Sequence, residues 1–322
     1  MKLQKLIPSF LAIAMSAGVL ASSAQAAVKT DNLVVYNFQK TEPATLDVSQ
    51  SYLKQFLPTE TSARLVTSDD GVVRYVSAKD ANTTLEHNLS TGDISFSRNF
   101  NRYLGSFVPK LPDGDSAVKI ATAFLEQNKL APANSDELKV AHVGGLRTTS
   151  VLATGKPGPV VDKLVTISFS RQLNGAPVIG AGSKFIVNVG DGGEVISASR
   201  RWRELDKPTR LASTEVLSEK EALELSNRQI LSEFGEKSRV EVLQTQIAYF
   251  DNNGETLQPV FAFQTKIQLA DQKLPAVEYV SVIPAMRKPL ENLNLTQLDP
   301  VALRTIKSGA TTIPPESDKT SD

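Results

Sequence analysis

Residues 164–198, which read LVTISFSRQLNGAPVIGAGSKFIVNVGDGGEVISA, carry the clearest fold signal in the chain. Apolar and polar residues alternate in three runs, at 164–169, 185–189 and 194–198. Turn signals separate these runs, Asn-Gly at 174–175 and Asp-Gly-Gly at 191–193. Asn-Gly is the strongest short-range hairpin signal because both positions tolerate a positive φ. The stretch therefore predicts an antiparallel meander of strands.

A helix is predicted just before this meander. Its apolar residues recur at helical spacing and form one face: Ala117, Ile120, Ala121, Phe124 and Leu125. Asp113 and Asp115 lie at its start, where carboxylates cap free amides and complement the helix dipole. A further strand-like run follows at 138–143. A helix packed on one face of an antiparallel sheet is the α+β layer arrangement.

The same plan recurs later in the chain. Ser218 and Glu221 have capping-box spacing, and an apolar-faced helix runs from them to Gly235. Strand-like runs follow at 240–250, 259–267 and 277–283. A looser version precedes the first unit, with a short helix at 47–57 and alternating runs at 71–76, 84–89 and 94–98. We therefore expect an α+β fold built from tandem modules, each a helix on an antiparallel meander.

The N-terminus has the order of a secretory signal. Lys2 and Lys5 precede a mostly apolar stretch at 6–20, and Ala24-Gln25-Ala26 has the small-x-small pattern of a cleavage site. We expect a signal peptide at 1–26 with cleavage after Ala26. No later segment approaches the roughly 20 apolar residues that a membrane helix needs. The predicted location is periplasmic or secreted, without a membrane span after signal removal.

Composition excludes several classes of function. The 322 residues include 35 Lys+Arg and 35 Asp+Glu, and loss of the signal would leave a net charge of −2. Such a balance argues against nucleic-acid binding, which usually needs a basic excess. With no cysteine and two distant histidines, the chain has no thiol nucleophile, HExxH motif or zinc ribbon. We expect no cofactor and no metal.

Catalytic candidates are few. Ser183 follows Gly182 in a sequence that differs from the GxSxG elbow, and its glycines suit a simple bend. His87 and His142 have no partner at an orienting spacing, so we expect both at surface or edge positions. The run DNNGE at 251–255 lacks the spacing and distal Glu of a calcium loop, and a hairpin turn explains it better.

One cluster stands out as a candidate for partner binding: Arg200, Arg201, Trp202 and Arg203. Arginine and tryptophan anchor interfaces and recognise carboxylates. In a strand, Arg201 and Arg203 would share one face, with Arg200 and Trp202 on the other. The alternative is a tryptophan packed between modules, with the arginines paired to local acids.

The meander resembles the hairpin of the thermolysin and fungalysin propeptide (FTP) motif. The resemblance is carried by an aromatic residue, a Gln, the Asn-Gly turn, Pro-Val, a Gly and the Asp-Gly turn: Phe169, Gln172, Asn174, Gly175, Pro177, Val178, Gly180, Asp191 and Gly192. The later unit resembles the related PepSY module, through Tyr249 and the run LQPVFAF at 257–263. Together the similarity covers residues 115–283.

The resemblance implies cystatin-like or PepSY-like layers and a division into modules. The expected pieces are an N-terminal α+β module at 27–110, an FTP-like unit at 111–210, a PepSY-like unit at 211–300 and a disordered tail at 301–322. Such modules form pro-regions that assist folding and inhibit secreted metallopeptidases, and they also occur as free-standing exported proteins. This sequence departs from the protease pattern because it contains no HExxH.

The leading hypothesis is an exported, non-enzymatic protein. It would bind or restrain a partner protein, with a secreted metallopeptidase as the candidate, through a strand edge or the Arg200–Arg203 region. One alternative is a binding module for an anionic cell-wall or extracellular polysaccharide. Another is a hydrolase of unknown type that uses His87, His142 or Ser183.

Overall fold

The computed structural model of the chain describes residues 33–40, 42–60, 65–149, 156, 158–271, 273–291 and 293. The predicted signal peptide, its cleavage site after Ala26 and the predicted tail at 301–322 lie outside the described residues.

Strands dominate the described chain, and four helices accompany them. The helices are α1 (Leu46–Phe56), α2 (Asn101–Leu104), α3 (Gly114–Gln127) and α4 (Glu219–Phe234). The first strands are β1 (Val34–Asn37), β2 (Val66–Thr67), β3 (Val72–Val76), β4 (Thr84–Asn88) and β5 (Ile94–Ser97). The middle strands are β6 (Leu138–Thr148), β7 (Val161–Leu173), β8 (Ala176–Gly180), β9 (Lys184–Val189) and β10 (Val195–Arg201). The last strands are β11 (Thr209–Arg210), β12 (Arg239–Asp251), β13 (Thr256–Gln268) and β14 (Val277–Pro284).

All these strands belong to one hydrogen-bonded series. Its order is β11-β1-β13-β12-β8-β7-β9-β10-β5-β4-β3-β2, with β14 also on β13 and β6 also on β7. Every pairing is antiparallel except that of β12 with β8. The predicted α+β class with antiparallel strands is therefore confirmed.

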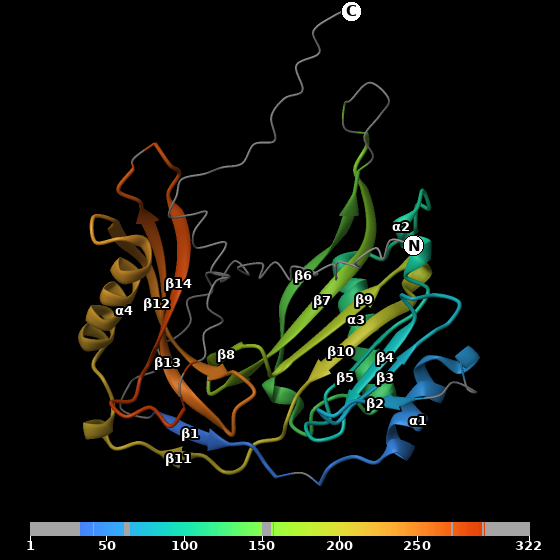
Figure 1. Cartoon of the computed structure of the whole chain (residues 1–322), viewed down its shortest axis with the longest axis horizontal. Helices are drawn as coiled ribbons and strands as arrows, with labels where there is room; N and C mark the ends of the chain where they lie inside the picture. Colours follow the sequence, from blue (N-terminus) through green and yellow to red (C-terminus); the bar gives the residue numbers. More distant parts are fainter. Residues whose placement is uncertain are drawn as a thin grey trace, which may run out of the picture.

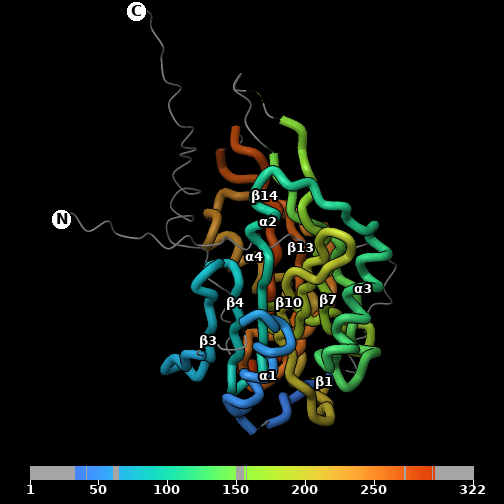
Figure 2. The backbone as a smooth tube through the Cα atoms, turned by 90° about the vertical axis from the view of Figure 1, so that its right-hand side faces the viewer, coloured from blue at the N-terminus to red at the C-terminus, as the bar shows by residue number. Residues whose placement is uncertain are grey.

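Two arms of the sheet rise from the region where β8 joins them (Figure 1). One arm holds β6, β7, β9 and β10, and the other holds β12, β13 and β14. Helix α4 covers the outer face of the second arm (Figure 1). Helix α3 lies on one side of the first arm, while β3 and β4 lie on the other side of the view in Figure 2.

Alternation along the strands and helix spacing explain the main core. The face of β9 made by Phe185, Val187 and Val189 is buried, and it packs in the same cluster as Ala121 and Leu125 of α3. The cap of α3 forms as expected, because the side chain of Asp113 accepts a hydrogen bond from the Ser116 amide at 2.7 Å. A second cluster lies between α4 and the β13–β14 strands.

The strands β1 to β5 are divided between the two arms. Strand β1 pairs with β11 and β13, so it belongs to the second arm. Strand β5 pairs with β10 and brings β4, β3 and β2 to the edge of the first arm. Burial explains the position of β1, since the ring of Tyr36 packs edge-on against Tyr249 with centroids 5.4 Å apart.

Candidate interaction site

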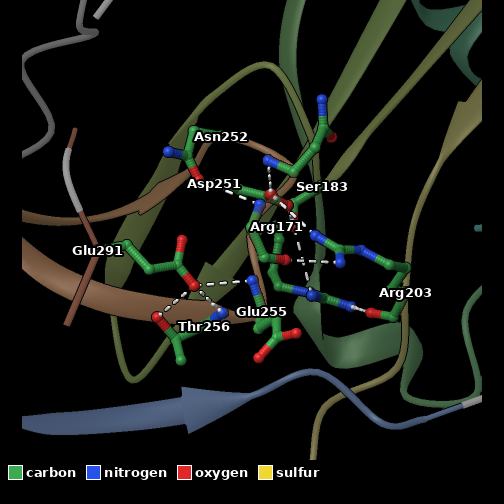
Figure 3. Close-up of polar contacts among 10 residues, drawn as sticks. Arg171, Ser183, Arg203, Asp251, Asn252, Glu255, Thr256 and Glu291 are labelled. Atoms are coloured by element: carbon green, nitrogen blue, oxygen red, sulfur yellow. Dashed lines mark hydrogen bonds and ion pairs between the residues drawn. The ribbon is translucent and has the colours of Figure 1, made fainter. Parts of the chain in front are cut away.

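A cluster of polar side chains connects the two arms (Figure 3). It consists of Arg171, Ser183, Arg203 and Asp251, and we call it the joint. Asp251, at the end of β12, is 2% exposed. Its Oδ2 accepts a hydrogen bond from Ser183 Oγ at 2.6 Å, and its Oδ1 lies 3.4 Å from Arg203 Nη2. Its carbonyl accepts from the Ala181 amide at 2.8 Å. A buried carboxylate is normally tolerated only when it is paired and hydrogen-bonded in this way.

Glycine is required where the β8–β9 loop wraps this carboxylate. A Cβ at Gly180 would lie 2.3 Å from the Asp251 carbonyl oxygen, and Gly180 also has φ +111°. A Cβ at Gly182 would lie 2.3 Å from Asp251 Oδ2. The glycines read from the sequence as permitting a bend thus also permit a close contact between the arms.

Arg171 of β7 completes the joint by hydrogen bonds to Ser183 and to the Arg203 carbonyl. It is fully buried and donates from Nη2 to the Arg203 carbonyl at 2.7 Å and from Nη1 to Ser183 Oγ at 3.3 Å. Its Nε lies 2.9 Å from Glu137 Oε2, an ion pair without hydrogen-bond geometry. Burial lowers the pKa of Arg171 to about 10, with Glu137 opposing the shift. The only indication of this burial in the sequence is that strand alternation places Arg171 on the same face as Phe169.

The Arg200–Arg203 segment is turned mostly inward. Trp202 is 2% exposed and packs between the Arg171 guanidinium, 3.8 Å from the ring, and Phe185. Arg200 donates to two backbone carbonyls. Of this cluster, only Arg201 is exposed. The placement fits the packed tryptophan of the alternative, but of its three arginines only Arg203 forms an ion pair with an acid among the described residues, Asp251.

Arg203 does not share the exposed position of Arg201. Strand β10 ends at Arg201, so the strand alternation that would place both on one face does not extend to Arg203. The Arg203 guanidinium lies 3.6 Å from the Phe38 ring and donates to the Gly254 carbonyl at 2.7 Å. These contacts place the end of its guanidinium in the joint.

The three catalytic candidates lie on separate elements. Ser183 is in the joint, His87 is on β4 and His142 is exposed on β6. The surface or edge position expected for His87 is wrong: the ring is 2% exposed and lies 2.8 Å from Ser49 Oγ of α1. Burial lowers the pKa of His87. Strand alternation places His87 with Leu85 on the inner face, a signal that the sequence did contain.

No hydrogen bond or ion pair among the described residues joins any two of these candidates. Within the same part of the chain, no group of three or more His, Asp or Glu side chains is placed to hold a metal ion.

The turn at 251–255 is the hairpin loop between β12 and β13, as expected. Asp251 Oδ1 accepts from the Asn253 amide at 3.0 Å, and Asn253 has φ +67°. Glu291 binds this loop from the following segment (Figure 3): its Oε1 accepts from the Glu255 and Thr256 amides, each at 2.7 Å. Sequence reasoning missed Glu291, because nothing in its neighbourhood indicates a distant amide partner.

The hairpin residues that carried the family resemblance have structural roles. Asn174 and Gly175 form the β7–β8 turn with φ +50° and +83°, and Gly192 has φ +62°. Asp191 accepts from the Lys110 amide at 2.8 Å, and Gln172 donates to the Gly175 carbonyl at 3.2 Å. The remaining residues of the set lie in strands: Phe169 and Val178 are buried, and Pro177 and Gly180 are half-buried.

Strand β6 is the most exposed strand of the first arm. Seven of its 11 residues are exposed, and it pairs along one edge only, with β7. No described residue pairs with its other edge. Two irregularities interrupt the β6–β7 pairing, between Val140 and His142 and between Leu146 and Arg147. Val140 is 45% exposed and Val143 is 39% exposed.

Two solved structures have a weak likeness to this chain. No protein-family model matches the chain, and no curated protein sequence matches it. A crystal structure of an uncharacterised protein from Eubacterium rectale has a TM-score of 0.47 at 10% identity, covering 82% of this chain and 86% of that one. The YpeB C-terminal domain of Bacillus megaterium has a TM-score of 0.37 at 15% identity, covering 76% and 99%. Both scores are below 0.5, so neither likeness supports a functional conclusion.

No helix in the described part of the chain is long and apolar enough to cross a membrane.

Proposed function

We propose that this protein is an exported, non-catalytic binding protein that engages a partner protein by strand addition at β6. The FTP-like and PepSY-like layering belongs to this proposal, because each arm packs one helix, α3 or α4, on antiparallel strands. The family resemblance names a secreted metallopeptidase as the candidate partner.

The exposed edge of β6, with which no described residue pairs, carries the proposal. A free strand edge presents a row of backbone donors and acceptors, and natural proteins usually cover, shorten or charge such edges. Here the edge is 11 residues long and includes the exposed apolar side chains of Val140 and Val143. An extended segment of a partner would pair with the backbone and place alternate side chains against these two valines.

Burial of the Arg200–Arg203 segment favours the strand edge as the binding surface. The other binding surface considered consists of the arginines and Trp202. It would need an exposed tryptophan, but Trp202 is only 2% exposed. The polysaccharide alternative used the same surface, and no contact among the described residues favours it.

The test uses the purified exported metallopeptidases of the same organism. Each is mixed with the protein, and complex formation is measured by size-exclusion chromatography together with peptidase activity. We expect one of them to form a complex and to lose activity. Absence of a complex and of inhibition with every peptidase would refute the peptidase as partner.

A matched pair of variants locates the surface. Val143→Lys places a charge on the β6 edge, which natural proteins use to prevent strand pairing, and should weaken the complex at least about tenfold. Val280→Lys is the control, because Val280 is similarly exposed, at 45%, on the β14 strand of the other arm. Equal affinity for the two variants would place the interface elsewhere.

A further inference from the structure

A pocket of about 160 Å³ opens beside the Arg200–Arg203 segment. Two guanidinium groups, two carboxylates and the indole of Trp202 line it: Arg200, Arg203, Glu42 and Glu204 supply the charges. Ala44 contributes one apolar wall. The pocket is separate from β6, and nothing in the strand-addition proposal uses it.

Arg200 is a largely buried cation without an ion-pair partner. Its Nε donates to the Leu130 carbonyl at 3.1 Å and its Nη1 to the Gly92 carbonyl at 3.3 Å. No carboxylate lies within ion-pair distance of it among the described residues. Burial lowers the pKa of Arg200. Glu204 and Asp93 act on Arg200 electrostatically without hydrogen-bonding it, and among the described residues its Nη2 has no hydrogen-bond partner, so this donor favours an anionic group in the pocket.

Arg203 and Trp202 also line the pocket. The guanidinium of Arg203 uses Nη1 and Nη2 within the joint, and its Nε has no hydrogen-bond partner among the described residues. The buried Nε1 of Trp202 also has none in that part of the chain. Guanidinium groups bind carboxylates well because their N–H groups match the two oxygens.

The two carboxylates make a simple anion a poor match. Glu42 and Glu204 would repel a ligand that carries only negative charge, whereas they would attract an ammonium group. An apolar cavity of about 150 Å³ holds a molecule of benzene size, so this pocket suits a ligand of about six heavy atoms. We infer that the pocket binds an amino-acid-sized zwitterion, with its carboxylate on Arg200 and Arg203 and its ammonium towards Glu42 and Glu204.

Trp202 provides a specific reporter because it is the only tryptophan in the chain. The purified protein is titrated with glycine, L-alanine and L-serine while tryptophan fluorescence and the indole N–H resonance are followed. We expect a saturable change that is half-complete at about 1 mM ligand, because a ligand with so few heavy atoms can bind only weakly. Acetate and methylamine, which carry one charge each, should bind at least about tenfold more weakly.

Three variants test the location. Ala44→Leu fills the pocket without removing a charge and should abolish the response. Glu42→Gln changes an exposed side chain and should weaken the amino acids at least about tenfold, while acetate, which Glu42 repels, should bind no more weakly than before. Arg201→Ala is the control, because Arg201 is exposed and does not line the pocket, and it should respond like the unmodified protein.

Three results would overturn the inference. These are no saturable response to any of the amino acids, an equal response to acetate, or an unchanged response in both Ala44→Leu and Glu42→Gln. Each leaves the β6 proposal untouched, since that surface is measured by complex formation.

Discussion

At the scale of single residues, buried polar side chains fix the contact between the two arms. Asp251 of the second arm holds Ser183 and Arg203 of the first, while Arg171 holds Ser183 and the Arg203 carbonyl. Each of these groups would be costly to bury alone. Together they favour one arrangement of the arms, because shifting one arm would leave several charged groups unpaired.

Replacing Asp251 tests the joint. Asp251→Asn keeps the size of the side chain but removes the charge that faces Arg203, and breaking a buried pair usually costs about 3 kcal/mol or more. We expect the free energy of unfolding, measured in urea, to fall by about that amount. Asp206→Asn, at an exposed position, should change it by less than about 0.5 kcal/mol. Similar losses in the two variants would show that Asp251 has no special role.

His87 predicts a pH dependence of stability. Burial lowers its pKa in the folded protein, so folding favours the neutral ring. The unfolded chain then takes up the proton more readily, and stability present above a pH of about 6.5 is lost as the pH falls below it, by at most about 1.4 kcal/mol per pH unit. Urea unfolding at pH values from about 7 down to about 5 measures this slope.

The matching variants separate His87 from other titrating groups. Ser49→Ala combined with His87→Phe removes both hydrogen-bonding partners and keeps an aromatic ring beside Tyr52. This double variant should show a flatter slope, whereas His142→Asn, at an exposed position, should retain the slope of the unmodified protein. An unchanged slope in the double variant would contradict the assignment.

At the scale of elements, local sequence signals predicted most helices and strands, but not which strands would meet. The Asn174-Gly175 turn and the alternation at 185–189 correctly predicted a hairpin turn after β7 and the inner face of β9, whereas β8 was not among the predicted strands. The same alternation could not place β1 beside β13 or β5 beside β10. It identifies the buried face of a strand, while the partner at its edge depends on contacts far along the chain.

The site was less predictable than the fold. Trp202 and its neighbouring arginines were predicted as a binding surface because of their residue types. In the structure most of them point inward, and a single sequence does not reveal this burial. Arg171 and Glu291 were missed because their partners, Glu137 and the 255–256 amides, are set by tertiary packing. Of these features, the sequence indicates only that Arg171 lies on the buried face of its strand, by alternation with Phe169.

Glu291 predicts a local change at the β12–β13 hairpin. Its carboxylate accepts from two backbone amides and from Thr256 Oγ1 at 3.0 Å. Glu291→Ala should therefore speed hydrogen exchange of the Glu255 and Thr256 amides by about tenfold, since a charge-assisted bond contributes about 1.5 kcal/mol. Glu278→Ala, an exposed change on β14, should leave both amides unchanged. Unchanged exchange in the Glu291 variant would contradict the contact.

At the scale of the whole molecule, the joint holds the β6–β7 arm and the β12–β14 arm as two projections of one sheet system (Figure 1). Each arm buries one face under its helix, and the outermost strands of the arms, β6 and β14, each have one edge with no pairing partner among the described residues. Among them, β6 combines length, exposure on both faces and a free backbone edge. The proposed function depends on this strand.

Hydrogen exchange of the β6 amides, with and without the peptidase that forms a complex, is the measurement to make. Strand addition predicts that amides between Leu138 and Thr148 on the free edge become protected by at least about tenfold, because new backbone hydrogen bonds must open before they exchange. A complex that leaves the β6 amides unchanged and protects another surface, such as the region around Arg201, would contradict strand addition.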